Sequence, residues 1–116
     1  KSKNILGHSD IAPDRKKDPG EKFPWSFLAK KKVGLWHSIT KQRLKSRRKK
    51  TIDINHKKKF HENLIKIGYL NKKQAKDKLI GFVIKAFQRR YRQELVNGKL
   101  DKECLLISEN IAKKFD

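Results

Sequence analysis

A histidine, a lysine and an aspartate near the start of this 116-residue chain are its residues with the clearest potential for chemistry. His8 is followed eight residues later by Lys16, and Asp18 comes two residues after that. Histidine and carboxylate side chains are zinc ligands in proteins, and a nearby ammonium group can stabilise an oxyanion. A His and an Asp without further context leave two interpretations open, a metal site or an ordinary surface pair, and the second is the commoner.

The surrounding residues favour the first interpretation. The stretches Gly7–Pro13, Arg15–Gly20 and Phe23–Trp25 form a gap-free pattern of about 20 residues. This pattern resembles the second half of the zinc-dependent N-acetylmuramoyl-L-alanine amidases of the type 2 group. The resemblance implies hydrolysis of the amide between N-acetylmuramic acid and L-alanine by a zinc-activated water. It also implies roles for three residues, with zinc held by His8 and Asp18 and the oxyanion stabilised by Lys16.

The same resemblance implies residues that this chain does not contain. The family takes another His ligand and a proton-handling Glu from earlier segments, whereas the pattern here begins at Gly7. The chain has no Met and starts at Lys1, so we expect a fragment or a processed product. Two ligands hold zinc poorly. We therefore expect Zn²⁺ in the full-length parent and little activity from this chain alone, which leaves its status as an enzyme uncertain.

The elements that would position these residues divide the chain into three predicted segments. Residues 1–40 are interpreted as the carboxy-terminal end of an amidase catalytic domain. They comprise an edge strand at 4–8, a loop rich in Asp, Pro and Gly, and a short helix from about Ser26 to Lys32 that stops before Gly34. The predicted fold class is mainly α, a remnant of an α/β amidase domain followed by a small helical module.

Residues 41–59 carry ten basic residues and one acidic residue, which accounts for nearly half of the chain's net charge of +20. They lack an apolar stripe, and we interpret them as a basic linker with helix near its start. Such charge attracts nucleic acid, anionic lipid or an acidic wall polymer without choosing among them.

Residues 60–116 regain helical periodicity. Gly68 is expected to end a first helix, and Asp101 is expected to cap the last one. The apolar positions at helical spacing are Phe60, Leu64 and Ile67, then Val83, Phe87 and Tyr91, then Cys104, Ile107, Ile111 and Phe115. These features predict a three-helix module around one small core.

The module resembles the peptidoglycan-binding-like domain in its runs 67–69, 86–91, 97–98 and 100–101. That resemblance implies binding of peptidoglycan or muropeptides, with Tyr69, Gln88 and Arg89 as candidate ligand-binding residues. Two alternatives stay open: Gln88 hydrogen-bonds its own chain, and Arg89 forms a solvated face with Arg90 and Arg92. The lysine-rich stretch 70–79 departs from the family's usual Gly-Pro-Thr loop.

Two competing functions use the same features. A basic nucleic-acid-binding protein fits the charge, but the chain has no zinc finger, RNA-binding signature or glycine-rich arm, so no specific nucleic acid is expected. A non-catalytic wall-binding remnant is the other alternative. No apolar run approaches the length of a membrane span, and the single cysteine excludes an internal disulfide. A bacterial envelope location, periplasmic or exported, is favoured by analogy, with the cytoplasm as the alternative.

Overall fold

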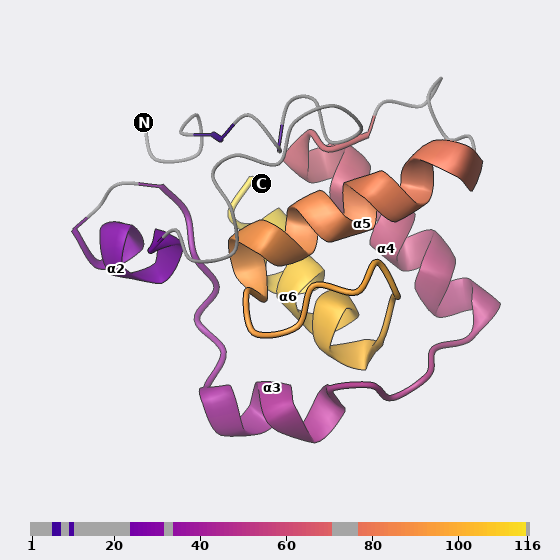
Figure 1. The fold of residues 1–116 in the computed structure, drawn as a ribbon, viewed down its shortest axis with the longest axis horizontal. Coiled ribbons are helices and arrows are strands. Elements are labelled where there is room, and N and C mark those ends of the chain that lie inside the picture. Colours follow the sequence, from indigo (N-terminus) through magenta and orange to yellow (C-terminus); the bar gives the residue numbers. More distant parts are fainter. Residues whose placement is uncertain (1–5, 8–9, 11–23, 32–33, 71–76, 116) are drawn as a thin grey trace. The chain divides into compact units, whose positions relative to one another are not determined.

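The computed structural model describes residues 6–7, 10, 24–31, 34–70 and 77–115. These residues hold five labelled helices and no strand: α2 (Trp25–Lys30), α3 (Lys41–Arg47), α4 (Ile54–Ile67), α5 (Asp77–Tyr91) and α6 (Lys102–Lys113), as Figure 1 shows. The mainly helical prediction is confirmed. The predicted edge strand at 4–8 lies almost entirely outside the described residues, and Leu6 and Gly7 within it are not in a strand.

The chain divides into two compact units whose sequences are interleaved. One comprises Lys1–Trp36 with Gln74–Lys99, and the other comprises His37–Lys73 with Leu100–Asp116. We call these the first unit and the second unit. The predicted limits 1–40, 41–59 and 60–116 stay predictions.

The helices of the second unit begin and end where local chemistry dictates. Asp53 caps α4 by accepting a hydrogen bond from the His56 amide at 2.8 Å, and Asp101 caps α6 through the Cys104 amide at 3.0 Å. Gly68 ends α4 with φ of 108°, a left-handed conformation that a residue with a side chain adopts only with strain. The predicted roles of Asp101 and Gly68 are thus confirmed.

The core of the second unit forms where α3 and α4 pack against α6. Its buried apolar side chains include Leu44 from α3, Phe60 and Leu64 from α4, and Cys104, Ile107 and Ile111 from α6. One polar contact crosses this core, since the Asn63 amide donates to Ser108 Oγ at 3.0 Å.

The basic segment 41–59 contains all of α3 and the beginning of α4. Leu44 is its buried anchor, and most of its basic side chains are exposed. Arg48 is only partly exposed and forms a two-pronged ion pair with the fully buried Glu103 of α6, each N–O distance being 2.9 Å. Much of this segment is therefore folded onto α6, beyond the helix expected near its start.

In the first unit, α2 packs against α5. The buried apolar side chains are Trp25 from α2 and Val83, Ile84, Ala86, Phe87 and Tyr91 from α5. Among the described helices, none combines the length and the apolar composition that a bilayer span requires.

Candidate functional site

The predicted catalytic and metal-binding residues, His8, Lys16 and Asp18, lie outside the described residues. Their immediate framework is described at three places: Gly7 and Asp10 on either side of His8 in sequence, and Trp25 at the end of the sequence pattern. These three residues are buried.

Gly7 and Asp10 are joined by two hydrogen bonds. The Gly7 amide donates to Asp10 Oδ2 at 2.9 Å, and the Asp10 amide donates to the Gly7 carbonyl at 3.2 Å. An aspartate side chain that bonds the nearby backbone is a common way to fix a tight turn. The two residues that bracket His8 are therefore held at a fixed separation.

The carboxylate of Asp10 also forms a buried ion pair with α5. Arg90 Nη1 lies 3.1 Å from Asp10 Oδ2, and each side chain is only 3% exposed. Two opposite charges tolerate such burial only when they are paired and hydrogen-bonded. Arg90 thus supplies the positive charge that allows Asp10 to bond the Gly7 amide inside the unit.

The same guanidinium stacks on the indole of Trp25. Arg90 Cζ lies 4.0 Å from the ring centroid, within the range of a cation–π contact. Gly34 lies against this pair. Its φ is +85°, and a methyl group on it would lie 3.3 Å from Arg90 Nη2. A glycine is required there both by the backbone conformation and by the space.

Tyr91, next to Arg90, belongs to an aromatic cluster. Its ring centroid lies 5.0 Å from that of Phe87 and 5.6 Å from that of Trp36. Burial raises the pKa of Tyr91 to about 12, although the charge of Arg90 opposes the shift. The phenol therefore stays neutral at physiological pH and serves packing.

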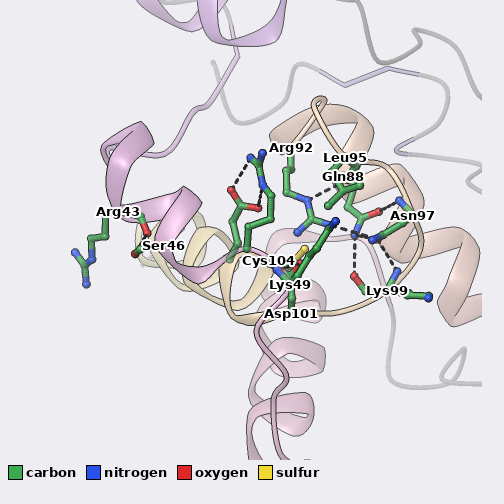
Figure 2. Close-up of polar contacts among 12 residues, drawn as sticks. Arg43, Ser46, Lys49, Gln88, Arg92, Leu95, Asn97, Lys99, Asp101 and Cys104 are labelled. Atoms are coloured by element: carbon green, nitrogen blue, oxygen red, sulfur yellow. Dashed lines mark hydrogen bonds and ion pairs between the residues drawn. The ribbon is translucent and has the colours of Figure 1, made fainter.

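Gln88, a candidate ligand-binding residue, is fully buried and bonds the loop that follows α5. Its Oε1 accepts from the amides of Asn97 and Gly98, both at 2.9 Å, and its Nε2 donates to Asn97 Oδ1 and to the Lys99 carbonyl. Figure 2 shows the side chain pointing into this loop. These four bonds match the two donors and two acceptor sites of an amide, so the alternative in which Gln88 bonds its own chain is what the structure shows. Its ligand-binding role stays a prediction.

Arg89, Arg90 and Arg92 are buried, which corrects the interpretation of them as a solvated face. Their exposed fractions are 5%, 2% and 3%. The guanidinium of Arg92 donates to the Leu95 carbonyl at 3.0 Å and to Asn97 Oδ1 at 3.3 Å (Figure 2). The polar partners of Arg90 and Arg92 come from segments outside α5, which the periodicity of α5 alone does not reveal.

The two other ligand-binding candidates are also buried. Tyr69 belongs to the second unit, directly after the Gly68 cap, and its amide donates to the Leu64 carbonyl at 2.9 Å. Arg89 and Gln88 belong to the first unit. The ligand-binding roles of Tyr69 and Arg89 stay predictions.

Sequence reasoning missed the framework residues Asp10, Arg90 and Gly34. Asp10 had a visible signal, since it lies inside the sequence pattern two residues after His8. Arg90 had none, because its contact with Asp10 spans 80 positions of the sequence.

The described part of the chain contains no group of three or more His, Cys, Asp and Glu side chains placed to hold a metal ion. His37 is among the described histidines, and burial together with the charge of Lys114 lowers its pKa to about 4. It is therefore neutral at physiological pH.

Comparison with known proteins gives relatives over the whole chain. No family model matches it. It is 36% identical over 118 residues to the N-acetylmuramoyl-L-alanine amidase AmiD of Escherichia coli (strain K12), covering 99% of this chain and 42% of that protein. It is also 74% identical over 23 residues to the 1,6-anhydro-N-acetylmuramyl-L-alanine amidase AmpD of Enterobacter cloacae, covering 20% of this chain and 12% of that one.

Solved structures agree with the sequence comparison. The structure of E. coli AmiD in complex with the substrate anhydro-N-acetylmuramic acid-L-Ala-D-gamma-Glu-L-Lys matches with a TM-score of 0.79 and 35% identity, covering 98% of this chain and 44% of that one. AmpDh3 from Pseudomonas aeruginosa matches with a TM-score of 0.78 and 29% identity, covering 98% and 45%. The chain spans less than half the length of these relatives.

Proposed function

Because this chain belongs by homology to the type 2 amidase family of AmiD and AmpD, we propose that it forms part of an enzyme that hydrolyses the amide between N-acetylmuramic acid and L-alanine. The observation that carries the proposal is the 36% identity to an N-acetylmuramoyl-L-alanine amidase across 99% of the chain. E. coli AmiD and AmpDh3 have each been solved with an anhydromuramic peptide bound. Muropeptides are accordingly the substrate class proposed here, with action on the bacterial cell envelope.

The chemistry of the donor set supports zinc as the cofactor. His8 and Asp18 offer an imidazole nitrogen and a carboxylate oxygen, which are ligand types of catalytic zinc sites. The described residues near His8 are compatible with a metal site. Two hydrogen bonds hold Gly7 and Asp10, which flank His8 in the sequence, at a fixed separation. Bound zinc would supply an activated water and polarise the scissile carbonyl.

The other contributions come from this chain's own residues. The ammonium of Lys16 would stabilise negative charge on the carbonyl oxygen as water adds to it. Asp10 and Trp25 hold the two ends of the segment that contains Lys16 and Asp18, and their own positions are fixed by Arg90. A site held by packed, hydrogen-bonded neighbours keeps its geometry through the reaction.

The metal site is tested in the complete gene product that contains this chain. His8→Ala and Asp18→Ala should each abolish stoichiometric zinc, measured by atomic absorption, together with muropeptide cleavage. Lys16→Ala should keep zinc and lose turnover by about 10²–10³-fold, the usual cost of removing one oxyanion-stabilising group. Full turnover in all three variants would refute the assignment.

We further propose that residues 60–116 contribute wall binding. The support is their resemblance to the peptidoglycan-binding-like domain, with Tyr69, Gln88 and Arg89 as the candidate contacts. Attachment to an insoluble polymer would raise the local concentration of substrate at the catalytic site.

A further inference from the structure

We propose that Arg90 is a positioning residue for the metal site, because its guanidinium contacts both ends, Asp10 and Trp25, of the segment that carries Lys16 and Asp18, and Asp10 lies two residues after His8. This inference rests on the proposed amidase function. At one end Arg90 Nη1 lies 3.1 Å from Asp10 Oδ2, and at the other Arg90 Cζ lies 4.0 Å above the Trp25 ring.

The contact at Asp10 passes directly to the backbone beside His8. Asp10 Oδ2, the oxygen that Arg90 contacts, also accepts the hydrogen bond of the Gly7 amide at 2.9 Å. Arg90, Asp10 and Gly7 therefore form a continuous chain of polar contacts from α5 to the residue before His8. Loss of the guanidinium leaves a carboxylate that is 3% exposed without this partner. The hydrogen-bonded pair Gly7 and Asp10, which flanks His8 in the sequence, then loses this support.

The contact at Trp25 closes the other end of the segment. Lys16 and Asp18 both lie between Asp10 and Trp25 in sequence. Arg90 contacts both of these described residues, so it ties together the two positions that flank Lys16 and Asp18 in the sequence. Gly34 leaves room for the guanidinium in this position, since a methyl group there would lie only 3.3 Å from Arg90 Nη2.

The geometry explains why arginine occupies this position. A guanidinium is planar, always charged and able to bond a carboxylate at its edge while its face stacks on an aromatic ring. An ammonium keeps the charge but lacks the planar face. Lysine should therefore restore the function of Arg90 only in part.

The test compares Arg90→Met with Arg92→Met in the complete zinc-loaded protein. Arg92 is the matched control, since it lies two residues after Arg90 and is similarly buried, but its guanidinium donates to Leu95 and Asn97 in the loop after α5. Zinc affinity, measured by competition with a chromogenic chelator, should fall about 10–100-fold in Arg90→Met, as for other outer-shell partners of a metal site. It should stay within about twofold of wild type in Arg92→Met, and Arg90→Lys should lie between.

A purely structural role predicts a different pattern. In that case both Met variants lower the unfolding temperature, and zinc affinity is equal in the two, which would overturn the proposal. Asp10→Asn provides a second route if Arg90→Met fails to fold, because it keeps the size of the side chain and removes its charge. It should weaken zinc binding in the same direction, and wild-type zinc affinity in Asp10→Asn would also overturn the proposal.

A readout without zinc separates this inference from the amidase proposal. In the metal-free protein, hydrogen exchange at the Gly7 amide should accelerate by about tenfold or more in Arg90→Met and should not change in Arg92→Met. Absence of zinc binding by the wild-type protein defeats the amidase proposal. Unchanged Gly7 exchange in Arg90→Met defeats the positioning role whether or not zinc binds.

Discussion

At the scale of single residues, Gln88 shows how one amide organises a loop. It is fully buried and bonds Asn97, Gly98 and Lys99, so the turn after α5 depends on a side chain within the helix. A buried backbone amide without its acceptor costs free energy because it has lost water and gained nothing in return.

Gln88→Leu should therefore lower the free energy of unfolding by about 2–3 kcal/mol, since it orphans the Asn97 and Gly98 amides. Chemical denaturation of the variant and of wild type measures the difference. Gln42→Leu, at an exposed position on α3, is the control and should stay within about 0.5 kcal/mol. An equal loss in the two variants would show that the hydrogen bonds between Gln88 and the loop do not stabilise the fold.

His37 makes stability depend on pH. Its pKa in the folded chain is about 4 against an ordinary value of 6.5, through burial and the charge of Lys114. The unfolded state therefore binds the extra proton between these values, and stability is lost as pH falls from about 6.5 to about 4. His37→Asn, which keeps an acceptor for the Ile39 amide, should flatten this part of the stability–pH curve. Identical slopes for wild type and variant over that window would contradict the assignment.

At the scale of elements, α3 and α6 are linked by a charge pair at the end of α3. Arg48 follows α3, and its guanidinium donates two hydrogen bonds to Glu103, which is fully buried in the first turn of α6. Asp101 adds a second link, because its carboxylate accepts both from the Cys104 amide of α6 and from the Lys49 amide at 3.2 Å (Figure 2). The amino terminus of α6 thus fixes the chain that leaves α3.

Arg48→Met should lower the free energy of unfolding by about 2–3 kcal/mol, because it removes from the buried Glu103 the guanidinium with which it forms an ion pair. The expected loss is below that of a fully buried pair, since the Arg48 side chain is 22% exposed. Arg47→Met, at an exposed position on α3, should cost under about 0.5 kcal/mol. Thermal and urea unfolding of both variants measure this difference in the free energy of unfolding. Equal losses in the two variants would show that the ion pair contributes no net stability.

The sequence predicted those features that depend on neighbouring residues. Asp101 is a cap because its side chain reaches an amide three positions away, and Gly68 ends α4 because of its own backbone conformation. Arg90 escaped prediction because Asp10 and Trp25, which it contacts, lie in distant parts of the sequence, and a basic residue on a helix is usually exposed. Arg48 belonged to a segment without an apolar stripe, so its pairing with Glu103, 55 positions away, was equally hidden.

At the scale of the whole molecule, nearly half of the net charge of +20 lies in residues 41–59, where the second unit exposes α3 and the start of α4. Such a surface attracts polyanions in general. Charge alone therefore does not distinguish the acidic polymers of the cell wall from nucleic acid as a partner. The homology to amidases favours the cell wall over nucleic acid as the proposed partner.

The wall-binding proposal predicts that the protein sediments with purified sacculi at moderate salt, and that excess duplex DNA does not release it. Binding that depends on charge alone should disappear steeply as salt rises, while specific wall contacts should persist. Retention on DNA with none on sacculi would favour the nucleic-acid-binding alternative instead.

The most direct measurement is cleavage of anhydro-N-acetylmuramic acid-L-Ala-D-gamma-Glu-L-Lys, the substrate bound in the E. coli AmiD structure, by the complete zinc-loaded gene product. Chromatography with mass detection should show the free tripeptide and anhydro-N-acetylmuramic acid appearing in equal amounts, and Lys16→Ala should suppress both. An intact substrate after prolonged incubation with a folded, zinc-loaded protein would contradict the account.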